Sequence, residues 1–480
     1  MFRGHQTLER GHLMVSMSAK KEQTKQEKFD DISTPKLKFK EKLSYGLGDL
    51  GNGMMFDMGQ IYLLKFFTDI LGISAFYGGL VFLVSKIFDA FVDTGVGTYV
   101  DSRTNIGKRG KFRPFILYGT VPLAICTVLS FIAPNLDQTG KTIWAFATYM
   151  LFNAAYSVVN IPYGSLSASM TVNAEDRTQL SVYRNLGSQA ALFVAGIVVI
   201  PLVNQFPNHA VGYPIAVALL AIVGVILHLI CYKNVKERHV IQRPKTKGMG
   251  KKAFVSLLKN GAFAVLAIYT LLTIMSMFLK QSSQLYYFQY VMDAPNLVGL
   301  VSTLNFAVLV PALYITTLLS KRIGKKMTAI VGIAGFVVCE ILNFALFGDY
   351  ITTFLIVNTI SSFFLVIPNT VTWAFIADVV EYGQWKSGIR SEGITYSSYS
   401  FTRKISQALA GFIPGLALTM IGYQPNVAQT TETLTGLKVL FFAVPGVGCL
   451  IALIIFLIGY PLTDKRHKQI VKELALREEI

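Results

Sequence analysis

Charged residues are scarce in this chain, and their scarcity argues against an ordinary soluble domain. Only 15% of the 480 residues are Asp, Glu, Lys or Arg, whereas soluble domains carry about a quarter. The mean hydropathy is +0.49, and apolar runs of roughly 18 to 25 residues recur from Leu43 to Tyr460. Each run is long enough to cross a bilayer as a helix. The sequence therefore predicts an all-α membrane protein with about twelve transmembrane helices.

Cysteine and the motifs of catalysis are also lacking. The four cysteines sit singly in apolar runs, without the spacing of a disulfide framework or a metal site. The chain has no Gly-rich phosphate loop followed by Lys and Ser or Thr, no His/Cys metal spacing and no nucleophile elbow. These absences argue against a metal centre, a cofactor, ATP-driven pumping and an enzyme.

Acidic residues are outnumbered by basic ones, 27 to 44, which gives a formal net charge of +17. The Lys and Arg residues cluster in every second loop between the apolar runs, at 20–42, 103–113, 233–252, 321–326 and 465–477. By the positive-inside rule both termini are cytoplasmic and the number of spans is even. We expect these clusters to meet anionic lipids of the cytoplasmic membrane and not nucleic acid.

The longest internal polar stretch, YKNVKERHVIQRPKTKGMGKK, begins at Tyr232 and falls after the sixth apolar run. It divides the chain into two six-helix halves, and a short echo between NIGKRGKF at Asn105 and RIGKKMTA at Arg322 supports the division. The predicted segments are a disordered cytoplasmic arm (1–41), a first bundle (42–232), a cytoplasmic linker (233–252), a second bundle (253–462) and a cytoplasmic tail (463–480).

Two carboxylates, Asp89 and Asp93, interrupt the second apolar run. They are one helical turn apart, so they lie on the same face of a helix. A charge at the bilayer centre costs at least about 2.5–3.5 kcal/mol, so this face must meet a cavity or a partner. One interpretation is structural, with the two acids neutralising Arg403 or Lys404 of the other half. The other is functional, because stacked carboxylates favour a bound proton or a hard cation such as Na⁺.

Other polar residues also lie within apolar runs. Pro162 can kink the fourth span and turn the Asn160 amide towards a cavity. In the seventh span, Gln281 and Gln284 offer amides that could hold sugar hydroxyls or could hydrogen-bond neighbouring helices. We interpret Lys280, beside them, as reaching the outer interface.

Two charged loops occupy corresponding places in the two halves. One interpretation is that both are simply solvated. If both lie on the cytoplasmic side, ion pairs between them would instead latch an outward-facing state. The candidate gating residues are Asp101, Arg109, Arg113, Asp378, Glu381 and Arg390.

Several ordered motifs resemble a single family. They are KLSYGLGDLGNG, FFTDILGIS, FDAFVD followed by GKFRPFIL, NIPYGSL, ADVVEYGQWKSGIRSEGITYSSYSFTRK and YPLTDKR. From about Lys42 to Asp464 the chain resembles the glycoside-pentoside-hexuronide cation symporters, and it is more similar to the glucuronide and xyloside or isoprimeverose transporters than to the melibiose permeases. The resemblance implies the major-facilitator fold and sugar uptake coupled to H⁺, Na⁺ or Li⁺.

The resemblance also implies roles for individual residues at the cation site. Asp89 and Asp93 correspond to the carboxylates of that site, Ser157 to a hydroxyl position and Lys404 to the lysine that couples cation and sugar. Val92 stands at a further polar position of the family's site. Loss of that ligand favours H⁺ over Na⁺, although Na⁺ at the two carboxylates stays open.

The family's sugar contacts correspond only in part to this chain. Gly53 and Gly164 stand where the melibiose permeases carry a sugar-binding Asp and a Trp, which suggests a larger site for a different glycoside. Arg184 aligns within one residue of a sugar-contacting Arg and would accept the carboxylate of a hexuronide. The predicted sugar contacts are Asp57, Asn160, Arg184, Gln281, Gln284 and Ser400.

We therefore predict a secondary active transporter, monomeric and multi-pass in the cytoplasmic membrane. It would import a glycoside by symport with a cation, H⁺ in preference to Na⁺, through alternating access. Two alternatives stay open: a lipid or amphiphile carrier on the same fold, and a membrane sugar sensor that does not translocate.

Overall fold

The computed structural model describes residues 36–478 except 104–106, 108, 172, 239–255, 258, 348–349 and 389–391. Side chains at 101, 174, 347, 392, 475, 477 and 478 are also left undescribed. Residues 1–35 of the predicted arm and most of the predicted linker lie outside the described residues. Within the described part the regular elements are all helices, so the all-α prediction is confirmed.

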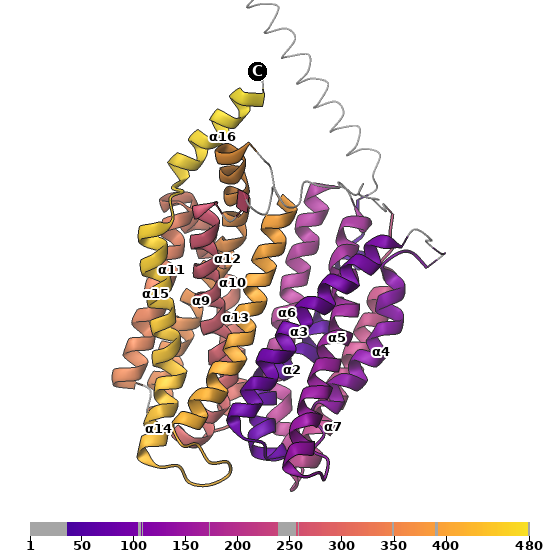
Figure 1. Cartoon of the computed structure of the whole chain (residues 1–480), viewed down its shortest axis with the longest axis vertical. Coiled ribbons are helices and arrows are strands. Elements are labelled where there is room, and N and C mark those ends of the chain that lie inside the picture. The colour runs from indigo at the N-terminus through magenta and orange to yellow at the C-terminus, as the bar shows by residue number, and fades with distance from the viewer. Residues whose placement is uncertain are drawn as a thin grey trace, which may run out of the picture.

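The helices form two groups that lie side by side (Figure 1). The N-terminal group comprises α2 (Phe39–Lys65), its π-helical continuation η1 (Phe66–Leu71), α3 (Ala75–Ser102), α4 (Arg113–Leu129), α5 (Gln138–Met170), α6 (Ala174–Val203) and α7 (His209–Asn234). The C-terminal group comprises α9 (Gly261–Tyr286), η2 (Tyr287–Val291), α10 (Leu297–Ile323), α11 (Lys325–Leu342), η3 (Asn343–Phe347), α12 (Ile351–Ser387), α13 (Glu392–Met420), α14 (Thr431–Lys438), η4 (Val439–Ala443), α15 (Val444–Gly459) and α16 (Asp464–Glu478).

Nine helices of the described part are long and apolar enough to cross a membrane. They are α3, α5, α6, α7, α9 with η2, α10, α11, α12 and the continuous α14–α15. Helix α4 is apolar but has only 17 residues. Helices α2 and α13 are 27 and 29 residues long but carry more polar side chains. These lengths and compositions are those of an integral membrane protein.

Short polar side chains start several of these helices. The side chains of Ser74, Asp137, Asn173, Asn208 and Asn260 accept hydrogen bonds from backbone N–H groups in the first turns of α3, α5, α6, α7 and α9. Such caps satisfy amides that have no partner within the helix. The helix starts are therefore encoded locally, before any packing between helices.

The two ends of the described chain pack on the bundle. Helix α2 begins three residues before Lys42, and Leu37, which precedes it, is buried and donates its N–H to Asp176 Oδ2 at 2.9 Å. The predicted tail forms α16, whose Glu473 accepts a hydrogen bond of 2.6 Å from Trp385 Nε1. Both segments begin or end on the same side of the molecule, which we call the terminal side; α2 ends on the opposite side (Figure 1).

In the part of the chain that the structure describes, buried apolar residues join the two groups near one side of the molecule and not near the other. One cluster includes residues of both groups, among them Phe67 and Phe82 of the first and Tyr286 and Leu418 of the second. Two further clusters each belong to one group. They contain Tyr45, Tyr163 and Cys231 in the N-terminal group, and Tyr269, Tyr460 and Ile470 in the C-terminal group. The shared cluster lies towards the opposite side, and the separate clusters lie towards the terminal side.

Glycines along α3 and α13 show the same asymmetry. A Cβ built at Gly79 would lie 2.8 Å from the carbonyl oxygen of Phe412, and one at Gly411 would lie 2.5 Å from Phe82 Cβ. Nearer the terminal side, a Cβ at Gly97 or Gly393 would meet no described atom within 4 Å. The two helices therefore touch backbone to backbone near the opposite side and diverge towards the terminal side.

The first helix of each group ends in the same way. In η1 and η2, the carbonyls of Phe67 and Phe288 each accept a hydrogen bond from the amide six residues later. Gly72 and Asp293, each five residues after that carbonyl, have positive φ angles of 77° and 50°. The two groups thus repeat one local pattern, as expected for parallel repeats in a transporter.

We expect Gly79→Ala to lower the melting temperature of the purified protein, because the new methyl group would overlap the backbone of α13. Overpacking of a tight contact costs about 1–3 kcal/mol. The matched control is Gly97→Ala, which adds the same methyl group to the same helix in open space. Since Ala favours a helix over Gly by about 1 kcal/mol, the control should keep or raise the melting temperature. Thermal unfolding followed by circular dichroism compares them, and equal shifts would contradict the tight contact.

Candidate functional site

Lys404 of α13 joins both carboxylates of α3 across the two groups. Its Nζ lies 3.0 Å from Asp89 Oδ2 and also pairs with Asp93. The Asp89 side chain is 6% exposed and the Asp93 side chain 31%. The two acids share one helix face, as their spacing predicts, and Asp93 is the one that solvent reaches.

Ser157 of α5 completes the coordination of the inner carboxylate. Its hydroxyl donates to Asp89 Oδ1 at 2.7 Å, so both oxygens of Asp89 have partners. The structure thus brings together all four residues of the predicted cation site. We call Asp89, Asp93, Ser157, Lys404 and the neighbouring Lys86 the charge cluster.

Sequence analysis did not identify Lys86. Its Nζ lies 4.0 Å from Asp89 Oδ2, donates to Asn153 Oδ1 at 2.8 Å and lies 5.0 Å from the centre of the Phe56 ring. The residue is 3% exposed. It precedes Asp89 by three positions, so helical spacing alone would have placed it on the same face. With Lys86, the cluster holds two lysines and two carboxylates.

A polar chain positions Asn160 on α5. Asn52 Nδ2 donates to Asn160 Oδ1 at 3.5 Å, and Asn52 Oδ1 lies 3.1 Å from His228 Nε2. The other ring nitrogen of His228 lies 2.8 Å from the Thr120 hydroxyl. The chain therefore links α5, α2, α7 and α4, and it holds Asn160 by groups that sequence analysis did not connect.

Arg184 of α6, the predicted contact for a carboxylate, already has a counterion. Its Nε lies 3.3 Å from Asp49 Oδ2, and its guanidinium lies 5.2 Å from the centre of the Tyr163 ring. The Arg184 side chain is 34% exposed. A guanidinium has five N–H donors, so one carboxylate leaves others free for a second anion.

The space expected around Gly53 is filled. A Cβ at Gly53 would meet Ala191 Cβ of α6 and would lie 3.0 Å from Asp57 Oδ2. Gly53 therefore serves the close packing of α2 on α6, and the expectation of a larger sugar site there was wrong. Gly164 fits that expectation better, because its Cβ would lie 3.7 Å from Arg184 Nη1.

The remaining predicted sugar contacts have few partners. Asp57 is buried, and no described residue pairs with its carboxylate. In the C-terminal group Gln281 Oε1 is buried without a hydrogen-bond partner in the described part, and Gln284 is 9% exposed. Ser400 is exposed on α13, one turn before Lys404. The structure links none of these side chains directly to Asn160 or Arg184.

The interpretation of Lys280 as an interfacial residue was wrong. Its Nζ lies 2.7 Å from Glu340 Oε1 and 3.2 Å from Asn358 Oδ1, and Ser361 donates to the same Glu340 oxygen at 2.6 Å. The ion pair fixes α9 to α11 and α12. A single lysine in an apolar run does not disclose a partner sixty residues away, so this ion pair could not be predicted from sequence.

An aromatic and cationic group beside Lys404 was also missed. The Arg403 guanidinium lies 5.4 Å from the centre of the Trp373 ring, and Trp373 is 48% exposed. The ring of Tyr396 lies 6.1 Å from that of Trp373. An arginine within the membrane normally faces a polar cavity, so this exposed indole is a further candidate surface for a sugar ring.

The predicted gating residues of the first loop contact their own group. Arg113 donates to the carbonyl of Tyr232 at 2.7 Å, and Glu237 accepts the N–H of Arg113 at 2.9 Å. Arg109 contacts the hydroxyl of Tyr118. The side chain of Asp101 lies outside the described residues.

The predicted gating residues of the second loop also contact only their own group, the C-terminal one, among the described residues. Asp378 pairs with Lys325 at 2.5 Å, and His467 of α16 lies 2.5 Å from Glu381 and 3.4 Å from Asp378. Arg390 lies outside the described residues. In the described part, no ion pair joins the two loops, and a latch between them stays a prediction for another state.

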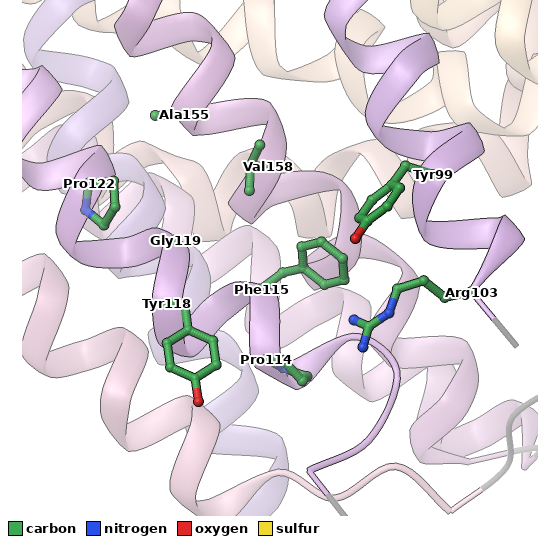
Figure 2. Close-up of a pocket in the computed structure, with 9 residues that line it drawn as sticks. All are labelled: Tyr99, Arg103, Pro114, Phe115, Tyr118, Gly119, Pro122, Ala155 and Val158. Carbon is green, nitrogen blue, oxygen red and sulfur yellow. The ribbon is translucent and has the colours of Figure 1, made fainter. Parts of the chain in front are cut away.

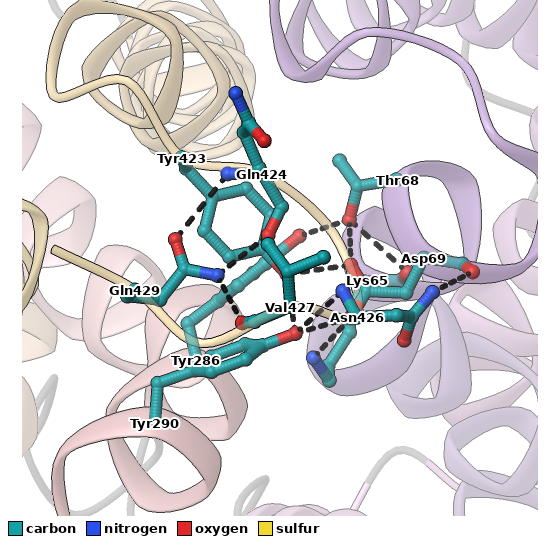
Figure 3. A network of polar contacts seen from close by, with 10 residues as sticks. All are labelled: Lys65, Thr68, Asp69, Tyr286, Tyr290, Tyr423, Gln424, Asn426, Val427 and Gln429. Carbon is teal, nitrogen blue, oxygen red and sulfur yellow. Dashed lines mark hydrogen bonds and ion pairs between the residues drawn. The ribbon is translucent and has the colours of Figure 1, made fainter.

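A network that sequence analysis did not predict joins the groups on the opposite side (Figure 3). Asp69 of η1 pairs with Lys65 at 2.6 Å and accepts hydrogen bonds from Tyr423 at 2.8 Å and Tyr290 at 3.2 Å. The backbone carbonyl of Asp69 accepts from Asn426 Nδ2 at 2.8 Å. We call this set the opposite-side latch.

Aromatic rings surround the cation of this latch. Lys65 Nζ lies 4.8 Å from the centre of the Tyr286 ring and 4.9 Å from that of Tyr290. Burial and Asp69 raise the pKa of the Tyr423 phenol above its usual value, so Tyr423 remains a donor to Asp69. Two phenols of the C-terminal group, Tyr290 of η2 and Tyr423 after α13, thus converge on one carboxylate of the N-terminal group.

Comparison with known proteins shows the family. The model of the MFS/sugar transport protein family matches residues 44–464. The chain belongs to this family. It is 45% identical to "Uncharacterized symporter YjmB" of Bacillus subtilis (strain 168), over 92% of this chain and 96% of that protein. It is 35% identical to "Glucuronide carrier protein homolog" of Escherichia coli (strain K12), over 92% and 97%.

A third relative is "Putative sulfoquinovose importer" of Escherichia coli (strain K12), 40% identical over 93% of this chain and 95% of that protein. These names confirm the resemblance to glycoside and hexuronide symporters, and the family consists of membrane transporters, not enzymes.

Among solved structures, the bacterial homolog of the lysosomal transporter Spinster matches with a TM-score of 0.65 at 14% identity, over 88% of this chain and 95% of that one. The nucleoside transporter NupG matches with a TM-score of 0.61 at 15% identity, over 88% and 99%. Both show the fold alone.

Lys404→Ala should destabilise the purified protein by about 3–5 kcal/mol, because it leaves the buried Asp89 carboxylate without its partner across the groups. In the double variant Lys404→Ala/Asp89→Asn the two losses should not add, with a coupling of about 0.5–3 kcal/mol. Denaturant unfolding in detergent measures the cycle. A control cycle pairs Asp89→Asn with Lys321→Ala, an exposed lysine of α10, and should be additive. Additivity in both cycles would contradict the direct contact.

Tyr423→Phe should weaken the opposite-side latch, because it removes the 2.8 Å hydrogen bond to Asp69. Loss of a hydrogen bond to a charged group costs about 1.5–3 kcal/mol, or about 10- to 100-fold in a conformational equilibrium. Thr139 and Thr352 are exposed on the opposite side, one in each group. The distance between spin labels at these two positions, measured by double electron–electron resonance, should be longer in the variant than in the wild type. Tyr350→Phe, on an exposed residue of the same side, is the control. An unchanged distance distribution would rule out this latch as a closing contact.

Proposed function

We propose that this protein imports an anionic sugar or glycoside of the hexuronide type together with a proton. The observation that carries the proposal is the contact of Lys404 with both Asp89 and Asp93 across the two groups. A cation and this lysine compete for the same carboxylates, so cation binding frees Lys404. A freed lysine, in turn, changes how the two groups attract each other.

The charge of the cluster favours an anionic cargo. Lys86 and Lys404 balance Asp89 and Asp93, so one added proton or Na⁺ leaves an excess positive charge. An uncompensated charge in a closed membrane cavity is costly. A sugar that carries a carboxylate or sulfonate would offset it, and the cargoes named for two relatives, a glucuronide and sulfoquinovose, carry such groups.

The choice of proton over Na⁺ rests on the ligands. Asp89 already accepts from Ser157 and Lys404, and the Val92 side chain offers no oxygen. Sodium needs several oxygen ligands together, whereas a proton needs one. Asp93, the more exposed acid, is the proposed proton carrier.

Arg184 is the proposed anchor for the anionic group. Its guanidinium is partly exposed and already held by Asp49 and Tyr163, so it is preorganised for a bidentate contact. Asn160 and Gln281 would bind hydroxyls, since Gln281 Oε1 has no partner among the described residues. Trp373 would stack on the sugar ring.

The proposed topology has twelve spans in two bundles of six, with both termini in the cytoplasm. The basic residues of the described loops, such as Arg103, Arg113, Lys233, Arg322 and Lys465, gather on the terminal side, which the positive-inside rule places in the cytoplasm. On this assignment the separation of the groups at the terminal side makes the state inward-facing, and the opposite-side latch closes the outer end. The transporter acts as a monomer in the cytoplasmic membrane. The proposed limits of its two bundles are 42–232 and 253–462, as predicted from the sequence.

Uptake into proteoliposomes tests the proposal. The panel contains a radiolabelled glucuronide, sulfoquinovose, a xyloside and a galactoside, with a proton or a sodium gradient imposed separately. We expect proton-driven accumulation of the anionic sugars, lost in Asp93→Asn. Arg184→Gln should reduce uptake of anionic sugars about 10- to 100-fold, the effect of losing one hydrogen bond to a charged group.

The matched control is Arg177→Gln, which removes an exposed arginine from the same helix and should change uptake little. Sodium-driven accumulation would overturn the proton assignment. Preference for neutral glycosides, unaffected by Arg184→Gln, would overturn the anionic cargo. If no sugar moves while a labelled amphiphile crosses, the carrier alternative replaces the proposal; sugar binding without movement would favour the sensor.

A further inference from the structure

A groove on the outside of the N-terminal group has no part in the mechanism above (Figure 2). It has a volume of about 510 Å³ and lies between α3, α4 and α5. Its lining is apolar except for one guanidinium and two phenol hydroxyls. The lining residues are Tyr99, Arg103, Pro114, Phe115, Tyr118, Gly119, Pro122, Ala155 and Val158.

The position of the groove points to lipid. Helix α4 packs mainly on α5 and α7 of its own group, so its outer face is turned away from the C-terminal group. Beside the groove, Tyr118, Val121 and Ile125 are 60%, 50% and 55% exposed and follow one face of α4. An exposed apolar stripe on a membrane helix meets acyl chains, and the groove opens beside this stripe.

The mouth of the groove is basic. The Arg103 guanidinium lies 5.3 Å from the centre of the Phe115 ring, and that of Arg109 lies 5.7 Å from the centre of the Tyr118 ring. Among the described side chains, no carboxylate forms an ion pair with either arginine. The nearby Glu237 accepts instead the backbone N–H groups of Lys111, Phe112 and Arg113.

We propose that this groove binds one anionic phospholipid of the leaflet on the terminal side. An acyl chain fills the apolar part, and the phosphate lies between the guanidinium groups of Arg103 and Arg109. Guanidinium forks match the oxygens of a phosphate, and basic pockets between membrane helices bind anionic head groups. The occupant is a lipid and not a soluble anion, because the apolar lining is far larger than the basic mouth.

The groove and the charge cluster share helix α5. Ala155 and Val158 line the groove on one face of α5, while Ser157, between them in sequence, donates to Asp89 on another face. An acyl chain against Ala155 and Val158 therefore lies on the helix that carries Ser157 of the charge cluster.

Native mass spectrometry of the detergent-purified full chain tests the site, with phosphatidylglycerol titrated against phosphatidylcholine of the same acyl chains. We expect one phosphatidylglycerol bound with preference over phosphatidylcholine. Arg103→Gln/Arg109→Gln should weaken it about 30-fold, because each basic residue near an anionic head group contributes about a five-fold factor. Ala155→Phe, which fills the groove and keeps both arginines, should also weaken it.

The matched control is Lys321→Gln/Arg322→Gln, which removes two exposed cations from the same side in the C-terminal group. It should leave the affinity within two-fold of the wild type, a difference of about 0.4 kcal/mol. Equal weakening by the control, or equal binding of the neutral lipid, would overturn the proposal.

Wild-type protein provides a test that does not depend on the folding of variants. Phosphatidylglycerol with a photoreactive group in one acyl chain is bound and irradiated, and the labelled peptides are identified by mass spectrometry. Label concentrated in residues 114–122 and 155–158 is expected. Label spread over the other membrane helices without enrichment there would overturn the assignment of the site.

Discussion

The attraction between Lys404 and the two carboxylates of α3 is the interaction on which the rest of this structure depends. It joins the two groups across the middle of the molecule. Without it, each group would carry an unpaired charge in its membrane-spanning part. Removing one partner of such a pair is costly, because the charge that remains loses both water and its counterion. Each carboxylate can therefore leave the lysine only when something else compensates it. This condition ties the movement of the groups to what the cavity holds.

The contacts between the groups differ in kind along the molecule. Near the opposite side, backbones touch at Gly79 and Gly411, and the latch around Asp69 adds directed hydrogen bonds. Midway along the molecule, the groups are joined by the ion pairs of Lys404 with Asp89 and Asp93. Towards the terminal side, α16 and the loop after α7 serve their own groups, as His467 with Glu381 and Glu237 with Arg113 show. Close packing acts only at short range, whereas ion pairs act over a distance, so the contacts between the groups become longer-ranged away from the opposite side.

Much of the fold and part of the site were predictable from sequence. Nine apolar helices of the described part follow from hydropathy, and the single face of Asp89 and Asp93 follows from helical periodicity. Lys86 was accessible by the same rule and was overlooked. Contacts between distant segments, such as Lys280 with Glu340 or Asn52 with His228, carry no local signal. The motif that contains Asp69 pointed to the family, yet its role depends on Tyr423, more than 350 positions away.

Asp69 and Tyr290 occupy corresponding places after the first helix of each repeat, and they hydrogen-bond to each other. Residues related in this way meet on the axis that relates the repeats. Two identical copies of the N-terminal half would therefore set one aspartate against another, and the like charges would push the halves apart. Two copies of the C-terminal half would set phenol against phenol, and neither the Asp69 carboxylate nor the Lys65 cation would be present. The lock on this face depends on the halves having become unlike, so a perfectly symmetric version of this protein could not close it in the same way.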